Sequence, residues 1–453
     1  MVNKIKNNYI YLFVGVLCSI IFSMIKFIGD DTVNTSSQFL KTSIMSTVIK
    51  GYHTWSSRIM INYIMYHVEK FCSEYGVFIF GILTGILIFI SLKTLDDIFN
   101  EKNTNIMKFI ILGVVLIYPF NILSSAGWIA TMTTYYWPLV FFYVAIKPVI
   151  YYLNNKKINK KLYFFATLGI IYSANNEQMM IGLFILYTTV IVYMLITKFK
   201  IHVYVYIQYF LVIISGIFIM TTPGNSVRKT LEIGTWMPSF VMMNNIDKFQ
   251  LGYTSTITGL LTIPSVEVIL LSILLIIIAF AERKNIFEKI LVSVPLLICS
   301  FFGLPSNIWL KLYPNLDNIN RSVTDGTFMY GLIDFSNYFD KNIFVEYIIL
   351  GIFTLSLFTS IVIMISNRNY KVLGGALFVG GMLSRILMGF SPTIWASGDR
   401  TYGFLYGCIS IIIIILMKDF VDSSKSKNKD AIAVAVVLVA FVNILSLSLQ
   451  IIN

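Results

Sequence analysis

The chain has few charged residues and few cysteines, and each shortage narrows what it can be. Asp, Glu, Lys and Arg make up 12% of its 453 residues, whereas soluble domains carry roughly 25%. This composition excludes an ordinary soluble enzyme. Three of the four cysteines, Cys18, Cys299 and Cys408, lie inside apolar runs, and Cys72 has no evident partner. Because no C-x-x-C pair occurs either, the sequence indicates neither a disulfide framework nor a cysteine metal site.

Several motifs of well-known enzyme classes are also missing. The chain has no G-x-x-x-x-G-K-[ST] phosphate loop, no G-x-S-x-G elbow and no H-E-x-x-H pair, and its three histidines are scattered. A zinc site and a Ser–His pair are therefore not supported. The net charge of +12 comes mostly from lysines and arginines in short loops between apolar runs, where such residues set orientation and contact lipid headgroups. Nucleic acid is not an expected partner.

Long apolar runs dominate the sequence, since 57% of the residues are hydrophobic. The spacing and length of these runs predict an all-α membrane protein with about 13 transmembrane helices (11–14), forming one polytopic domain over residues 1–453. The predicted spans are 9–28, 75–93, 106–123, 135–152, 162–174, 178–197, 203–221, 264–282, 287–304, 344–366, 372–390, 401–418 and 431–451. The segment 162–197 is either two short spans or a re-entrant hairpin.

Basic residues place the N-terminus in the cytoplasm. With that orientation, 21 of the 34 Lys and Arg residues fall in the short cytoplasmic segments, as the positive-inside rule requires. Three long segments, 29–74, 222–263 and 305–343, are then external. Within the first, Gln38–Lys50 has its apolar residues at helical spacing, which predicts an amphipathic helix in the membrane interface.

The unusual polar residues gather on this external side. Gly29-Asp30-Asp31 follows the first span directly, where ionised groups near hydrocarbon are costly. The two carboxylates either do chemistry or form a solvated loop or an N-cap of the next helix. The remaining members of this external group are Trp55-Ser56-Ser57-Arg58, Tyr135-Tyr136-Trp137-Pro138, Asn175-Asn176-Glu177, Pro223-Gly224-Asn225 with Arg228, and the later residues Arg321, Asp325, Asp334, Arg385, Asp399 and Arg400. The cytoplasmic loops show only lysine-rich charge, so the working site is expected to face outward.

Each motif in this group also has a structural interpretation. Trp55 can be an interfacial anchor and Arg58 can extend to the interface, or the two can bind a phosphate. Pro223-Gly224-Asn225 can be a turn, or with Arg228 it can present backbone N–H groups and a guanidinium to an anion. Glu177 is either a structural cap or a further acid of the site.

This layout resembles the multispan glycosyltransferases of the GT-C type, which have an acidic residue or pair in the first outer loop, then juxtamembrane helices, and an active site at the external membrane surface. The segments around residues 29–31, 55–58, 175–177 and 223–228 are also similar to a bacterial family of polytopic proteins of unknown function with the motifs W-x-G-R and P-G-N-x-x-R. Here Ser57 stands where that family has Gly. The resemblance covers the first half of the chain best, and beyond residue 260 it rests on the pattern of spans alone.

The resemblance implies a transferase in the bacterial plasma membrane, working at the extracytoplasmic face with a polyprenyl-phosphate sugar as donor and a cell-envelope glycan or lipid as acceptor. Asp31, or else Asp30, would be the general base. The donor phosphate would be bound by Arg58 and Arg228, with Arg321, Arg385 and Arg400 as further candidates. The residues expected to contact the sugar or acceptor are Trp55, Tyr135, Trp137, Asn176, Glu177 and Asn225. A divalent cation, Mg or Mn, with Asp30, Asp31 and Glu177 as ligands is left open.

Two other functions remain as alternatives. A polysaccharide polymerase or ligase would use lipid-linked glycans and an arginine-rich outer loop, but the segment 305–343 has only Lys311, Arg321 and Lys341. A flippase or transporter of lipid-linked sugars would place ionisable residues near mid-membrane in interrupted spans, often with inverted repeats. No repeat is visible in this sequence.

Overall fold

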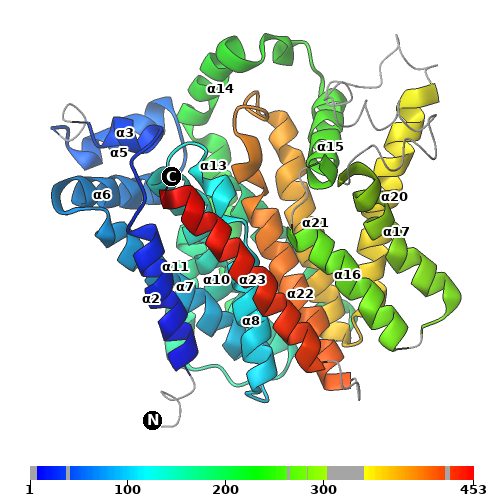
Figure 1. Ribbon diagram of the computed structural model, residues 1–453. Helices are drawn as coiled ribbons and strands as arrows, with labels where there is room; N and C mark the ends of the chain where they lie inside the picture. The colour runs from blue at the N-terminus through cyan, green and yellow to red at the C-terminus, as the bar shows by residue number, and fades with distance from the viewer. Residues whose placement is uncertain are drawn as a thin grey trace.

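Figure 1 shows the computed structural model of the chain, a bundle of helices in which residues 8–36, 41–262, 266–282, 284–303, 341–423 and 429–452 are described. Every regular element within these ranges is a helix. The prediction of an all-α fold is therefore confirmed for the described residues. We call the end of the bundle that carries α3, α5, α6 and α14 in Figure 1 the upper end; it is the end that the sequence predicts to be external.

Within the described ranges, nine helices are long and apolar enough to cross a membrane. They are α7 (Phe78–Phe99), α8 (Asn105–Ile117) continued by η1 (Phe120–Ser124), α9 (Trp128–Thr131) continued through η2 (Met132–Tyr136) and α10 (Trp137–Leu153), α12 (Glu177–Ile196), α13 (Val203–Thr221), α20 (Lys341–Met364), α21 (Arg368–Ile386) with η6 (Leu387–Phe390), η7 (Gly398–Tyr402) with α22 (Gly403–Ser423), and α23 (Lys429–Ile452). A tenth is α15 (Asn245–Thr262) with α16 (Val266–Ala281), if this pair, bent by 76°, counts as one span. The structure thus supports a multi-pass protein but not the count of 13.

Length explains much of this difference. The helix in the first predicted span, α2 (Tyr9–Phe22), has 14 residues, so it is about 21 Å long against a hydrocarbon core of about 30 Å. It packs closely on α7 through small residues, because a Cβ added to Gly85 would lie 1.9 Å from Ser19 Oγ. Such small-residue contacts let two helix backbones approach in a membrane.

The segment 162–197 forms two helices joined by a short turn. The first, α11 (Lys160–Ser173), has 14 residues and the second, α12, has 20. Only α12 is long enough to be counted as a span. The turn between them, residues 174–176, carries two of the polar residues that the sequence singles out, and it lies at the upper end.

The upper end carries short helices that lie outside the spans. The first outer segment forms α3 (Asp30–Asn34), α5 (Ile44–Thr54) and α6 (Ile59–Tyr75), and the second forms α14 (Pro223–Trp236) and η3 (Pro238–Val241) before α15. The predicted amphipathic helix is α5, which begins at Ile44 and continues to Thr54. In the described structure α5 packs on α6 and on α14. The predicted outer segment 305–343 lies almost wholly outside the described residues.

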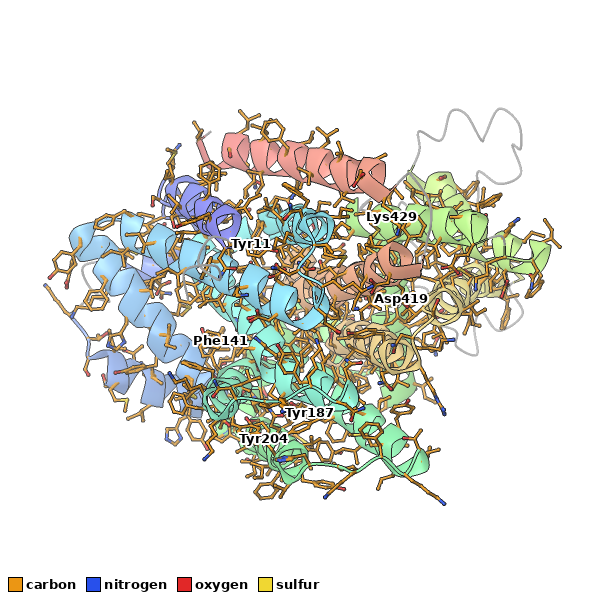
Figure 2. The ribbon with its side chains drawn as sticks, turned by 90° about the horizontal axis from the view of Figure 1, so that it is seen from below. Tyr11, Phe141, Tyr187, Tyr204, Asp419 and Lys429 are labelled. Carbon is orange, nitrogen blue, oxygen red and sulfur yellow. The ribbon has the colours of Figure 1, made fainter. Side chains whose placement is uncertain are left out.

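At the lower end, acidic residues that the sequence analysis passed over pair with the lysines. Asp97 accepts from Lys147 Nζ at 2.7 Å and also pairs with Lys93, while Glu101 pairs with Lys156 at 3.0 Å. Seen from below, Tyr11 of α2 and Lys429 of α23 lie on one side of the bundle and Tyr204 of α13 on the other, with Phe141 between the two sides (Figure 2). The ion pairs join α7 to α10 and to the loop beyond it, and so tie the lower ends of neighbouring helices together.

Candidate functional site

Asp31 is buried and caps a helix far away in the sequence. Its carboxylate accepts the backbone N–H of Ala130 at 2.9 Å (Oδ1) and of Ile129 at 3.1 Å (Oδ2), and the side chain is 0% exposed. These N–H groups belong to the first turn of α9, whose donors have no partner within the helix. Asp31 therefore caps α9, not the helix that follows it in the chain.

Two glycines with positive φ allow this contact. Gly29 has φ +53°, and the backbone N–H of Asp30 donates to Ala126 O at 2.9 Å. Gly127 has φ +116°, and a Cβ added there would lie 2.6 Å from Asp31 Oδ1. Any larger residue at Gly127 would be strained and would also press on the carboxylate.

Glu69 of α6, which lies outside every sequence motif, is close enough to the two aspartates for their charges to act on it. Its side chain is 1% exposed; Oε1 accepts from Asn34 Nδ2 at 3.1 Å, and Oε2 has no hydrogen-bond partner among the described residues. Burial raises the pKa of Glu69 well above its usual value, and the charges of Asp31 and Asp30 raise it further. Asp30 itself is exposed. We call Asp30, Asp31 and Glu69 the acidic cluster.

Burial also dominates the electrostatics of Asp31. Burial raises the pKa of this carboxyl from 3.8 to about 6, and the charge of Asp30 also raises it. The N–H groups of α9 favour the charged form and lower the pKa, but they do not offset burial. The signal that could have found Glu69 is its position on the buried face of α6, with Ile61, Met65, Val68 and Cys72. A lone carboxylate on an apolar helix face needs a reason.

A second cluster forms around Arg58, the residue before α6. Its Nε donates to Glu177 Oε2 at 2.8 Å, and Nη2 lies 2.7 Å from the same oxygen. Ser57 Oγ donates to Glu177 Oε1 at 3.4 Å, and the guanidinium lies 5.9 Å from the centre of the Tyr135 ring. The charge of Arg58 is thus already neutralised by a charge-assisted pair.

The adjacent Asn175 ties the turn before α12 to the first turn of α6. Its Oδ1 accepts the backbone N–H groups of Met60 at 3.1 Å and Ile61 at 3.2 Å, while its Nδ2 donates to Ser57 O at 3.1 Å. Both ends of the Asn175 amide therefore bond to the segment Ser57–Ile61, so W-S-S-R and N-N-E form one structural unit.

Asn176 caps its own helix. Its Oδ1 accepts from the backbone N–H groups of Gln178 and Met179, and Nδ2 donates to Thr134 O at 3.0 Å. An asparagine at this position is a standard N-cap. With all these bonds made, and with no exposed surface, Asn176 serves as a helix cap in this structure.

The P-G-N-x-x-R segment completes the second cluster. Asn225 Oδ1 accepts the backbone N–H of Ser57 at 3.2 Å, and the Arg228 guanidinium lies 5.0 Å from the centre of the Trp55 ring. Arg228 Nε also donates to Glu232 at 3.4 Å. Gly224 is required because a Cβ there would lie 2.6 Å from the backbone of Tyr52 and Trp55. We call these joined segments the motif cluster: Trp55, Ser57, Arg58, Asn175, Glu177, Asn225 and Arg228.

The remaining sequence-predicted residues are placed as follows. Tyr135 and Trp137 are buried, and Trp137 stacks on Phe80 with ring centres 6.1 Å apart. Arg400 donates to Ser125 Oγ at 3.4 Å in an exposed contact, whereas Arg385 is buried. Arg321 lies outside the described residues. Neither aromatic ring therefore presents a face to a sugar here, although Trp55, 46% exposed, does have free surface.

The acidic cluster and the motif cluster lie at different places on α6. Arg58 and Glu69 are eleven residues apart along this helix, which is about 16 Å at the usual rise. Glu177 belongs to the motif cluster and the aspartates to the acidic cluster, so the set Asp30, Asp31 and Glu177 does not converge. Among the described residues no group of three His, Cys, Asp or Glu side chains is arranged to hold a metal ion.

Comparison of the chain with protein-family models, with curated protein sequences and with solved structures found no match. The assignment of a function therefore depends on the chemistry of the two clusters and of the buried residues beside them.

Proposed function

We propose that the protein is a membrane glycosyltransferase that moves a sugar from a polyprenyl-phosphate donor to a cell-envelope glycan or lipid, at the extracytoplasmic face of a bacterial plasma membrane. The observation that carries this proposal is the acidic cluster at the upper end. Asp30 presents an exposed carboxylate next to a buried one, beside the helices α5 and α6 that lie outside the spans.

Asp30 is the better general base of the two aspartates. Both oxygens of Asp31 already accept backbone N–H groups, and the side chain is inaccessible. The exposed carboxylate of Asp30 can be reached by an acceptor. It would take the proton from an acceptor hydroxyl as the hydroxyl oxygen attacks the anomeric carbon, and the sugar–phosphate bond would break with its electrons on the phosphate. Asp31 and Glu69 would hold the loop that carries Asp30 in place.

Mass spectrometry of envelope glycans and lipids tests this assignment in cells that lack the chain or carry it in wild-type or variant form. Wild-type cells are expected to gain one sugar mass. Asp30→Asn is expected to insert normally and to lower the modified fraction by about 10²–10⁴-fold, the usual contribution of a general base. The control is Glu74→Gln, an exposed acid on α6 that pairs with Lys70 only at 4.0 Å.

Three results separate the alternatives. A normal glycan in Asp30→Asn cells would refute Asp30 as the base. Loss of the modification in Asp31→Asn cells alone would move the role to Asp31. Repeated units in place of a single added sugar would favour the polymerase.

A second candidate function, transport of a lipid-linked sugar, is favoured by Glu267. This residue is in the first turn of α16, after the 76° bend from α15, and is 1% exposed. Among the described residues, neither of its carboxylate oxygens has a hydrogen-bond partner. Buried acids in interrupted membrane helices are typical of transporters. Flipping of polyprenyl-phosphate glucose by purified protein in liposomes, lost in Glu267→Gln and unaffected by Asp30→Asn, would favour this function.

A further inference from the structure

Arg385 is a buried charge that no carboxylate of the described residues neutralises by contact. It lies at the upper end of α21, is 3% exposed, and its Nε and Nη1 atoms are enclosed without a hydrogen-bond partner in the described ranges. Its close contact is Tyr402, whose ring centre is 4.5 Å from the guanidinium carbon and whose side chain also hydrogen-bonds to the guanidinium. A buried cation in this state is costly unless something brings an acceptor to it.

Close packing of three elements holds Arg385 in this position. A Cβ added to Gly252 of α15 would lie 1.8 Å from Ile386 O, and one added to Gly389 would lie 2.0 Å from Lys248 O. Tyr402 OH donates to Ser255 O at 2.8 Å, which fixes the ring beneath the guanidinium. The position of the charge therefore follows from backbone contacts that allow little adjustment.

Two more polar side chains, Gln178 and Asp399, interact with this region. Gln178 Nε2 donates to Thr401 O at 2.8 Å, while Gln178 Oε1 is enclosed and has no partner within the described part of the chain. Asp399 lies near enough for its charge to interact with Arg385, although no hydrogen bond joins these two described residues. The region thus offers donors on Arg385 and a free acceptor on Gln178 for the hydroxyl of a ligand.

None of the other described arginines of the upper end is both buried and without a carboxylate partner. Arg58 is paired with Glu177, Arg228 stacks on Trp55 and contacts Glu232, and Arg400 is in an exposed contact. We propose that Arg385, with Tyr402 beside it, binds the phosphate ester of a sugar phosphate at the upper end of the bundle. Guanidinium donors match phosphate oxygens in geometry and charge.

The phosphate can come from two sources, a lipid-linked sugar in the bilayer or a water-soluble sugar phosphate. The inference rests on the proposed transferase only for the identity of the lipid, because a transporter of the same molecule would need the same phosphate site. Ligand binding, measured without any sugar transfer, therefore tests the site apart from the proposed function.

The experiment measures thermal stabilisation and binding of the purified full-length protein in lipid nanodiscs. The probes are polyprenyl phosphate without a sugar, glucose 1-phosphate and inorganic phosphate. Arg385→Gln removes the charge, Arg385→Lys keeps it without the planar fork, and Arg368→Gln is the matched control. Arg368 begins the same helix at the opposite end, is exposed, and contacts the Tyr193 ring.

Wild type and Arg368→Gln are expected to bind polyprenyl phosphate equally, Arg385→Lys at least tenfold more weakly, and Arg385→Gln not measurably. Without ligand, Arg385→Gln is expected to unfold at the same or a higher temperature than wild type, because it removes a buried charge that has no ion-pair contact among the described residues. If Arg385→Gln does not fold, the Lys variant carries the test.

Equal binding by wild type and both Arg385 variants would overturn the site, and so would the absence of binding to all three probes. Protection by glucose 1-phosphate as strong as that by polyprenyl phosphate would identify the soluble source. Protection by the lipid alone would identify the bilayer source. Normal polyprenyl phosphate binding in a protein that transfers no sugar would refute the proposed transferase and leave the site standing.

Discussion

Replacing Asp31 by asparagine should make the protein's stability less dependent on pH. Burial raises the pKa of Asp31 from 3.8 to about 6, a rise of about two units, which corresponds to about 3 kcal/mol at 1.36 kcal/mol per unit. Between about pH 4 and pH 6 the unfolded chain has lost this proton and the folded chain retains it. The folded state of the wild type should therefore lose about 3 kcal/mol as the pH rises through this window.

The asparagine of the Asp31→Asn variant cannot ionise, so the variant should lack this loss. Its side chain offers one acceptor oxygen where Asp31 offers two, and an unpaired N–H at the start of α9 costs about 1–3 kcal/mol at every pH. The difference in free energy of unfolding between Asp31→Asn and wild type should therefore move by about 3 kcal/mol in favour of the variant from pH 4 to pH 7. Urea titrations in detergent at a series of pH values measure it, with Glu74→Gln as control. A constant difference would show that the N–H groups of α9 cancel the effect of burial on the pKa of Asp31, and a difference that moves towards the wild type would show that they outweigh it.

Three further predictions concern the contacts that build the clusters. Gly224→Ala should lower stability by about 1–3 kcal/mol, because its Cβ would meet backbone atoms at 2.6 Å. Gly234→Ala on the same helix would meet open space and should raise stability by about 0.5–1 kcal/mol. Equal effects of the two variants in urea titrations would refute the close approach of α14 to α5. Gly127→Ala should lower the free energy of unfolding more than Gly398→Ala does. Both glycines have positive φ, but only the Cβ at position 127 would also press on the Asp31 carboxylate. Equal free energies of unfolding for the two variants would contradict the cap by Asp31. Glu177→Gln should lower stability by about 1–3 kcal/mol because it removes the counter-charge of Arg58 in a partly buried site. The double variant with Arg58→Gln should recover part of that loss, which a double-mutant cycle measures.

Sequence alone could predict the helices because their signal is local. A run such as 178–197 is apolar along its whole length, and the structure has α12 at Glu177–Ile196. Whether a run spans the membrane depends on its length and on its neighbours. The short α2, held against α7 by Gly81 and Gly85, shows that a predicted span can be a shorter helix that packs along a longer one.

The gathering of the motifs at one end of the chain's bundle was also predictable, but their roles were not. The sequence placed Arg58 and Glu177 on the same side, and the structure joins them at 2.7 Å. It gave no sign that Asn175 would cap α6, 114 residues away, or that Asp31 would cap α9, 98 residues away. A cap within its own helix, like Asn176, has a local signature, whereas a cap supplied from another segment depends on the packed fold.

These caps bear on where an anionic substrate can bind. Three helices, α6, α9 and α12, begin at the upper end, and their N-termini carry partial positive charge. The chain has already filled these ends with Asn175, Asp31 and Asn176, and it has paired Arg58 with Glu177. A phosphate arriving there would have to displace bonds that support the fold. Within the described residues, Arg385 has no ion pair with a carboxylate. An anion that binds there would gain a contact without breaking an ion pair. For this reason we place the phosphate at Arg385 and not at the sequence motifs around Arg58 and Arg228.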